Sequence, residues 1–597
     1  MKTKESKIHL LSLVLLFLAL AVLPFIVRIY AYHLDMEEYS WFILDEDRTD
    51  FFSYYKSLFF LILALLMAAD LIRALLRRHL SPGTSPVWAL LLINGILFLL
   101  SAVCSVNVKD SLFGNYGRFE SVFVLIGYEI LCFYAFRYAS DPRTFQILLR
   151  GLAAAAALMC LLGFLQAAGM DPLNLEWVQR LITPHELWDE VIGNISSNLT
   201  QNTVYLTLAN PNYASIYLSM LLPLMFILWK TGSRTVRFCS GCLILLLFAD
   251  LILTFSRVGL FSLGIIGILT LILRKNSRKR HWKKMLAAVF ACTLLFFLTD
   301  SLSGFRFAER LKLTLQSFQK SDTPSLTYME TSAEGVTLTY GGRTITVSYQ
   351  YGTGNESIRI LDDDGTDLTD HYIAPAGILD LEGLENLLLF TREVDEEDML
   401  TLIIDEVFWN FTEDPELGYL FYTGNGKYDT LSEIPRANLF GMEHMASGRL
   451  YIWSRTIPLL KDYWLTGSGE DTFYLVFPQN DYVGKAAYAG SPLDVIEKPH
   501  NTYLLTALQN GILSLILFLV FYLIYFIDSI RIYGKDRPFD TQDWMGFCVF
   551  LSTACFMTGG IFNDSNINIS PLFWAMLGIG MGLNRHIRAE RSQYSEQ

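Results

Sequence analysis

One arginine stands in the middle of a long apolar stretch. Between Phe238 and Leu273 the only charged residues are Asp250 and Arg257. A continuous helix over this stretch would be roughly 54 Å long, whereas the hydrocarbon core of a membrane is about 30 Å thick. The chain is therefore expected to break near its middle, which places Arg257 at a membrane face. Since an arginine in the hydrocarbon core costs a few kcal/mol, we expect Arg257 to bind something anionic.

Three further residues combine charge with a position beside a predicted span. Arg118 precedes one apolar run, Arg449 begins a predicted helix, and His500 directly precedes another apolar run. Arginine binds phosphate oxygens through a rigid bidentate fork, and histidine can act as a general base near neutral pH. Arg257, Arg118 and Arg449 with His500 as catalytic base would together suit a diphosphate substrate.

Each of these residues also has a purely structural interpretation. Arg118 and Arg257 could extend toward lipid head groups, as arginines at span ends often do. Arg455, one turn after Arg449, is expected to pair with an acidic residue of the same loop. His500 could be present only as part of the helix start, where its neighbour Asn501 is a residue type that caps helices.

A polar segment precedes another predicted span at Asn210-Pro211-Asn212. The proline keeps Asn210 out of the helical conformation, and Asn212 can cap the helix that follows. The alternative is a polar rim that binds a sugar, to which Asn210, Asn212 and Asn501 would contribute. The two interpretations are compatible.

The elements that position these residues are predicted to be membrane helices. Of the 597 residues, 52% are hydrophobic and 18% are charged, and the mean hydropathy is +0.35. Repeated apolar runs of about 20 residues indicate an all-α polytopic membrane protein. Twelve spans are expected at 8–30, 54–76, 85–106, 119–139, 144–168, 209–229, 238–255, 258–274, 285–302, 501–528, 543–562 and 570–586.

The distribution of lysine and arginine predicts the orientation of these spans. Every second connection is basic, most clearly residues 274–284. Because basic connections stay in the cytoplasm, both termini are predicted to be cytoplasmic. The candidate site residues then lie on the opposite, extracytoplasmic face. The strict alternation favours membrane topology over a nucleic-acid-binding role for the basic segments.

Residues 303–500 form one long extracytoplasmic connection between spans 1–9 (residues 1–302) and spans 10–12 with a tail (residues 501–597). This loop holds 14 Lys and Arg against 32 Asp and Glu, a net charge of −18, while the rest of the chain carries +5. Residues 325–435 alternate as strands do, with a hairpin signal at Gly341-Gly342, and predict a small inserted β-sandwich. Residues 436–500 are predicted to be helical again.

Two further sequence patterns bear on the loop 303–500. The acidic run at 362–367 lacks the spacing of a calcium-binding EF-hand loop, which favours a turn between strands. The eight cysteines all lie in or beside predicted spans, so no disulfide framework is expected in the loop.

Five short segments, in this order, resemble the O-antigen ligase and O-antigen polymerase superfamily of membrane glycosyltransferases. They are Leu112-Phe113-Gly114-Asn115-Tyr116-Gly117-Arg118-Phe119-Glu120, Asn210-Pro211-Asn212-Tyr213-Ala214, Thr254-Phe255-Ser256-Arg257-Val258-Gly259, Arg449-Leu450-Tyr451-Ile452-Trp453 with Leu465-Thr466-Gly467-Ser468-Gly469, and His500-Asn501-Thr502-Tyr503-Leu504 with Asn510-Gly511-Ile512.

The resemblance implies an architecture like that of the GT-C glycosyltransferases and a reaction without a metal or other cofactor. The substrates would be an undecaprenyl-diphosphate-linked glycan and a hydroxyl of a lipid, wall-polymer or glycan acceptor, at the outer face of a bacterial cytoplasmic (inner) membrane. Arg257 and Arg449 would hold the donor diphosphate, and His500 would activate the acceptor for inverting transfer. The strand-rich segment 325–435 departs from the family, whose loop is commonly shorter and helical.

Two other functions remain open from the sequence. A polysaccharide transporter or lipid-linked oligosaccharide flippase would usually show internal repeats and paired charges in mid-membrane, whereas Asp70 and Asp250 have no obvious basic partner. A glycan-binding membrane sensor would carry its function in residues 325–435 and would not need Arg257.

Overall fold

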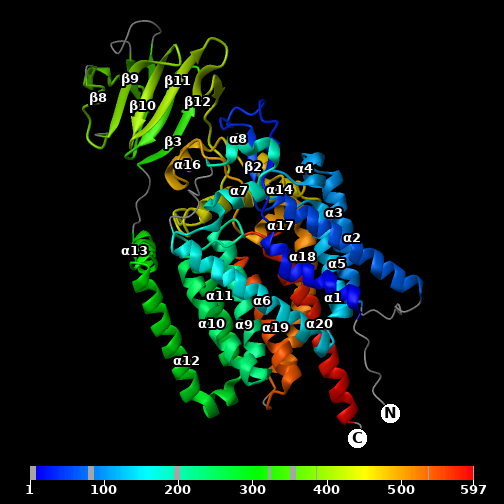
Figure 1. Cartoon of the computed structure of the whole chain (residues 1–597). Helices are drawn as coiled ribbons and strands as arrows, with labels where there is room; N and C mark the ends of the chain where they lie inside the picture. The colour runs from blue at the N-terminus through cyan, green and yellow to red at the C-terminus, as the bar shows by residue number, and fades with distance from the viewer. Residues whose placement is uncertain are drawn as a thin grey trace.

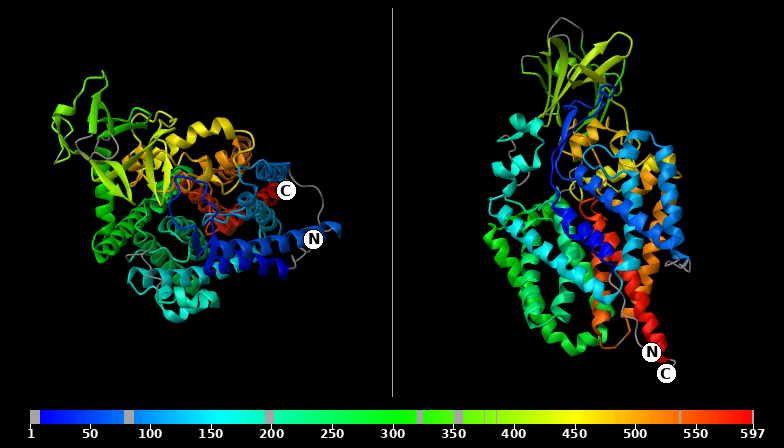
Figure 2. Two further views of the ribbon diagram at one scale, coloured as in Figure 1. Left: turned by 90° about the horizontal axis from the view of Figure 1, so that it is seen from above. Right: turned by 45° about the vertical axis from the view of Figure 1, so that its right-hand side comes forward.

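The computed structural model describes residues 9–77, 86–193, 202–319, 325–349, 358–374, 376–384, 386–535 and 537–595. Residues 8 and 85, which begin two of the predicted spans, and parts of the predicted β-rich segment lie outside these ranges. The helices gather in one body and the two larger sheets stand at one end of it (Figure 1, Figure 2).

The helices occupy the predicted spans and the loop between them. In the first half of the chain they are α1 (Leu10–Phe17), α2 (Tyr54–Leu76), α3 (Val87–Val103), α4 (Val108–Phe113), α5 (Val122–Tyr138), α6 (Pro142–Ala167), α7 (Glu176–Ile182), α8 (Trp188–Val191), α9 (Pro211–Thr231), α10 (Arg234–Leu253), α11 (Arg257–Leu273) and α12 (Lys275–Leu302). They continue with α13 (Arg306–Gln319), α14 (Arg449–Tyr463), α15 (Phe473–Val476), α16 (Tyr482–Tyr488), α17 (Thr502–Asn510), α18 (Ile512–Tyr533), α19 (Thr541–Gly559) and α20 (Ser570–Ser595).

Within the described residues, five helices are long and apolar enough to cross a membrane: α2, α6, α9, α10 and α18. A sixth is added if residues 289–302 and 306–313, bent by 96° at the break between them, are counted as one span. Each of the twelve predicted segments contains helix, but the predicted number of spans is not confirmed. α11 and α3 fall short because each has only 17 residues.

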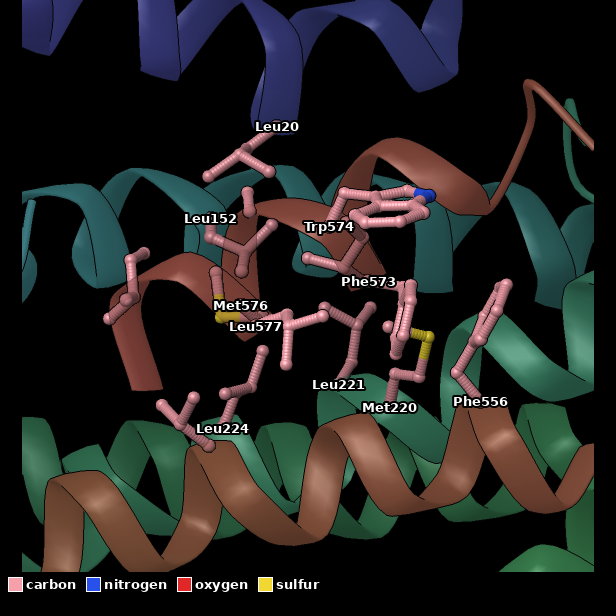
Figure 3. Close-up of a cluster of buried hydrophobic side chains, with 14 of the residues drawn as sticks. Leu20, Leu152, Met220, Leu221, Leu224, Phe556, Phe573, Trp574, Met576 and Leu577 are labelled. Atoms are coloured by element: carbon pink, nitrogen blue, oxygen red, sulfur yellow. The ribbon is translucent and has the colours of Figure 1, made fainter. Parts of the chain in front are cut away.

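Helix α9 lies at the centre of the bundle. Its most apolar part is 78% buried, compared with 28% for α2. It packs against α10 and α19, and α20 packs against both α19 and α5. Met220 and Leu221 of α9 meet Phe556 of α19 and Phe573 of α20 in this core (Figure 3). The helices that surround α9 therefore hold its amino-terminal end in a defined place.

The predicted span 501–528 is not one helix. It is divided into α17 and α18 at Gly511, whose φ is +84°. A Cβ atom there would lie 2.3 Å from the carbonyl oxygen of Leu465, and one on Gly467 would lie 2.1 Å from that of Gln509. Only glycine permits this close approach of two backbone segments. The break thus fixes the loop residues 464–467 against the end of α17.

The first predicted span, 8–30, is also shorter than expected. After α1, a π-helical turn (Leu18–Val22) and a 3-10 turn (Leu23–Phe25) end the helical path at Pro24 and Phe25. The chain then forms the antiparallel pair β1 (Tyr30–His33) and β2 (Asp47–Asp50). This hairpin was not predicted.

Residues 326–429 form two antiparallel sheets. One contains β3 (Leu326–Thr331), β4 (Val336–Tyr340), β5 (Arg343–Tyr349) and β6 (Ile358–Asp362) in sequence order. The other contains β7 (Tyr372–Ile373), β8 (Ile378–Leu379), β9 (Leu387–Val394), β10 (Glu397–Ile404), β11 (Val407–Asp414), β12 (Gly418–Gly424) and β13 (Lys427–Asp429) as a meander. Buried aliphatic and aromatic side chains of both sheets form one hydrophobic cluster.

Two local predictions for this region agree with the structure. Tyr340 pairs with Arg343 across the turn Gly341-Gly342, where both glycines have positive φ. After β6, Asp362 accepts the amide of Asp363 and Gly365 donates to the Asp362 carbonyl, so the acidic run forms a turn.

The sheets are tied to the segment that joins β1 and β2. Lys427 Nζ donates to the carbonyl oxygens of Met36, Tyr39 and Phe42 at 3.0–3.3 Å. Ser40 Oγ donates to Asp429 Oδ2 at 2.9 Å. The strand-rich part of the loop is therefore held against a segment almost 400 residues earlier in the chain.

Candidate functional site

Arg257 is the first residue of α11, directly after the break that the sequence predicts. Phe255 in the break has a φ of +51°, a conformation that is uncommon for a bulky residue. The Ser256 hydroxyl donates to Asn212 Oδ1 at 2.7 Å and accepts from the Ser215 hydroxyl at 3.0 Å. These bonds fix the position of Arg257 relative to the start of α9.

Arg449, which belongs to the long loop 303–500, comes close to Arg257. It is the first residue of α14 and follows three residues with positive φ, Ala446, Ser447 and Gly448. Arg257 Nη2 donates to Ser447 Oγ at 3.2 Å. Burial lowers the pKa of Arg449, the nearby Asp564 carboxylate partly offsets this, and the positive charge of Arg257 lowers the pKa further. The two guanidinium groups are therefore close enough for the charge of one to affect the pKa of the other.

His500 lies against a buried carboxylate. Its Nδ1 is 3.4 Å from Asp564 Oδ2, and the two side chains are 30% and 0% exposed. The backbone amide of Asn501 donates to Asp564 Oδ1 at 3.1 Å. Burial raises the pKa of Asp564, but the interaction with His500 and the charges of Lys498 and Arg118 outweigh it and hold this pKa below its usual value. The carboxylate thus stays ionised and can orient the imidazole ring.

Helix α14 connects these two parts of the site. Trp453, one turn after Arg449, donates its indole N–H to the carbonyl oxygen of Pro499 at 2.7 Å. Pro499 directly precedes His500. The segment that carries His500 is therefore positioned by the helix that begins with Arg449.

Lys498 adds a third cation. Its side chain is 19% exposed, and Nζ lies 5.9 Å from the centre of the Tyr213 ring of α9. Although burial lowers the pKa of Lys498, Tyr213, Glu497 and Asp564 raise it above its usual range. Lys498 therefore remains a cation between α9 and the His500 segment.

Arg118 lies in an ion-pair network, and its predicted role in binding the donor diphosphate stays a prediction. Its guanidinium group is buried and lies 2.7 Å from Glu120, 3.3 Å from Glu470 and 3.4 Å from Asp471. Asp471 also accepts the backbone amide of Glu120 at 2.9 Å. Arg118 thus joins two of the predicted motifs as part of an ion-pair network and does not extend toward lipid.

The three asparagines of the predicted sugar rim are engaged within the protein. Asn210, and not Asn212, caps α9: its Oδ1 accepts the amide of Asn212 at 2.7 Å. Asn501 caps α17 by accepting the amide of Leu504 at 2.9 Å, and its Nδ2 donates to the Ile561 carbonyl oxygen. Asn212 holds the Ser256 hydroxyl. Their capping and positioning roles are observed, and the sugar-binding role stays a prediction.

Arg455 pairs with an acidic residue of the same loop, as the sequence predicts. Its Nε donates to Asp481 Oδ2 at 2.7 Å, and both side chains are buried.

Four contributors to the site were not identified from the sequence: Ser256, Tyr213, Lys498 and Asp564. Asp564 had a recognisable signal, because the polar run Asn563-Asp564-Ser565-Asn566 separates two apolar helices. Lys498 stands two residues before His500, just outside the motif that begins with His500.

Comparison with known proteins gives one match. No curated protein and no solved structure matches the chain. Residues 417–519 match the family model described as O-antigen ligase. This segment carries Arg449, Lys498 and His500, whereas Arg257 and Arg118 lie outside it. The match confirms the resemblance predicted from the sequence: residues 417–519 of the chain are similar to the O-antigen ligase family.

Proposed function

We propose that this protein is a membrane glycosyltransferase of the O-antigen ligase and polymerase type. It transfers a glycan from an undecaprenyl-diphosphate-linked donor to a hydroxyl group of a lipid, a wall polymer or a growing polysaccharide. The observation that carries this proposal is the convergence of Arg257, Arg449 and Lys498 with the His500–Asp564 pair. Three cations and an oriented base in one place suit the release of a diphosphate.

The two arginines are assigned to the donor diphosphate. Arg257 donates to the hydroxyl of Ser447, two residues before Arg449, and its charge lowers the pKa of Arg449, so two positive charges lie close together. Bringing them together costs electrostatic energy that a bound dianion would offset. Guanidinium groups already in place also stabilise the negative charge that develops on the leaving diphosphate.

His500 is assigned as the general base, with Asp564 as its orienting partner. His500 takes the proton of the acceptor hydroxyl as that oxygen forms a bond to the anomeric carbon. The bond from that carbon to the phosphate oxygen breaks, and its electron pair leaves with the lipid diphosphate. Attack opposite the leaving group inverts the anomeric centre.

The proposal also includes the predicted topology. The family match and the apolar helices support a protein of the bacterial cytoplasmic membrane. We propose twelve spans, cytoplasmic termini and an extracytoplasmic site, so that the donor is used after it has reached the outer face of the membrane.

The test is transfer by the purified full-length protein in liposomes that contain the polyprenyl-linked glycan fraction of the native cells. Arg257→Ala is expected to reduce transfer about 10²- to 10³-fold. Arg234→Ala is the matched control, because Arg234 also begins a helix, α10, and its side chain is exposed. Arg234→Ala should transfer at the wild-type rate.

Two results would contradict the proposal. One is wild-type transfer by Arg257→Ala. The other is movement of the lipid-linked glycan across the liposome membrane by the wild type without any transfer, which would favour a flippase.

A further inference from the structure

A cavity lies beside the proposed reaction centre, on the side of the amino-terminal hairpin. Its volume is about 510 Å³, within the usual range of small-molecule sites. It is lined by β1 and β2 residues, by the loop that contains Tyr116 to Arg118, and by residues 494–498. Three distant segments of the chain thus enclose one space.

Arg48 of β2 provides unused hydrogen-bond donors in this cavity. Its Nε and Nη2 atoms are buried and have no hydrogen-bond partner among the described residues. The guanidinium group lies 5.9 Å from the centre of the Phe42 ring. Buried donors of this kind are costly unless something accepts from them. A turn of the Arg48 side chain toward a ligand with acceptor oxygens in the cavity would satisfy them.

The other lining residues define the chemistry of that ligand. Tyr32 and Tyr116 provide two partly exposed aromatic rings, and Asp494 and Glu497 provide exposed carboxylates. Aromatic rings pack against the apolar face of a sugar, while carboxylates accept hydrogen bonds from its hydroxyl groups. Asp494 and Glu497 offset much of the positive charge of Arg48, Arg118 and Lys498, which also line the cavity. The combination therefore favours a sugar ring over an inorganic anion.

The cavity adjoins the proposed reaction centre. Lys498 lines the cavity and is also the cation that lies near Tyr213. His500 is two residues further along the same segment. A sugar in the cavity would therefore lie close to the bond that is made or broken.

We propose that this cavity is a glycan-binding subsite in which Arg48, Tyr116 and Glu497 bind a sugar ring of the transferred or the accepting glycan. This inference rests on the proposed transferase function. It assigns a binding role to the amino-terminal hairpin, which lies outside the matched family segment.

The test uses the water-soluble oligosaccharide released by mild acid from the polyprenyl-linked glycan fraction. Its binding to the full-length protein in nanodiscs is measured by saturation-transfer NMR and titration. Arg48→Ala should weaken binding about 10- to 100-fold, and Glu497→Gln about threefold. Arg28→Ala is the matched control, because Arg28 is exposed, precedes the hairpin and contacts Tyr55 outside the cavity.

Transfer kinetics distinguish whether the bound sugar belongs to the donor glycan or to the acceptor. A higher KM for the lipid-linked donor in Arg48→Ala assigns the subsite to the donor glycan. A higher KM for the acceptor assigns it to the acceptor.

Failure of the subsite and failure of the transferase function give different results. The subsite is overturned if the wild type does not bind the oligosaccharide, or if Arg48→Ala binds it as tightly as the wild type. Arg449→Ala should still bind the oligosaccharide, which lacks the diphosphate. If binding depends on Arg48 but the wild type transfers nothing, the subsite stands and the proposed reaction fails.

Discussion

Two charged clusters, one around Arg118 and one around Arg257 and Arg449, have opposite electrostatic character. Arg118 is buried among Glu120, Glu470 and Asp471, and these carboxylates outweigh the effect of burial and raise its pKa. Arg449 is partly buried beside Arg257, and burial and the second guanidinium group lower its pKa. The first cluster is satisfied within the protein, whereas the second is suited to receiving an anion. Residue type alone does not distinguish the two roles.

The largest expected effect comes from the first cluster. Arg118→Ala would leave three buried carboxylates without their cation, which should cost about 3–5 kcal/mol of folding free energy. Thermal unfolding in detergent measures this loss. A variant with the wild-type melting temperature but no transfer would instead place Arg118 in the substrate site, and the contrast between the clusters would disappear.

The His500–Asp564 pair should show a pH-dependent contribution to stability. Since the folded-state pKa of Asp564 lies below the ordinary value of 3.8, its stabilising effect is fully present above that value. It is lost as the pH falls through the lower folded-state value. Asp564→Asn should therefore cost about 1.5–3 kcal/mol at neutral pH and progressively less below pH 3.8.

Melting temperatures of the wild type and Asp564→Asn between pH 3 and 7 test this expectation. Asp540→Asn, which changes a carboxylate in the cap of α19, is the control for a carboxylate outside the site. A constant difference between wild type and Asp564→Asn across this range would mean that the pair does not stabilise the folded state through charge.

The second cluster should depend on the shape of the guanidinium group as well as on its charge. Arg449→Lys keeps the charge but loses the bidentate fork, and transfer should fall about tenfold with little change in melting temperature. Steady-state rates at saturating and limiting donor measure the effect. An unchanged rate would mean that Arg449 acts only as a point charge.

The smallest effect is expected at Ser447. Ser447→Ala removes one hydrogen bond to Arg257, which is worth about 0.5–1.5 kcal/mol, and transfer should fall about two- to tenfold. Ser491→Ala, which changes a serine elsewhere in the loop 303–500, is the control. A loss as large as that of Arg257→Ala would show that Ser447 itself contacts the substrate.

The sequence predicts much of the local structure. The break before Arg257, the turn at Gly341-Gly342 and the start of α17 at Asn501 follow from composition, glycine and capping residues. The break at Gly511 was not predicted, because its cause is the approach of Leu465 and Gln509. The hairpin of β1 and β2 was not predicted, because the segment that joins the two strands is held by Lys427, almost 400 residues later in the chain.

The sequence by itself determined a helical membrane protein, the strand-forming character of residues 326–429, and Arg257, Arg449 and His500 as candidates. Those features depend on residue type and on neighbours a few positions away. Only the tertiary structure decided that Arg118 joins a buried network, that Asp564 lies against His500, and that Arg48 faces a cavity with Tyr116. The partners in these contacts are up to about 350 residues apart, and burial and the nearest charge fix the role of an arginine.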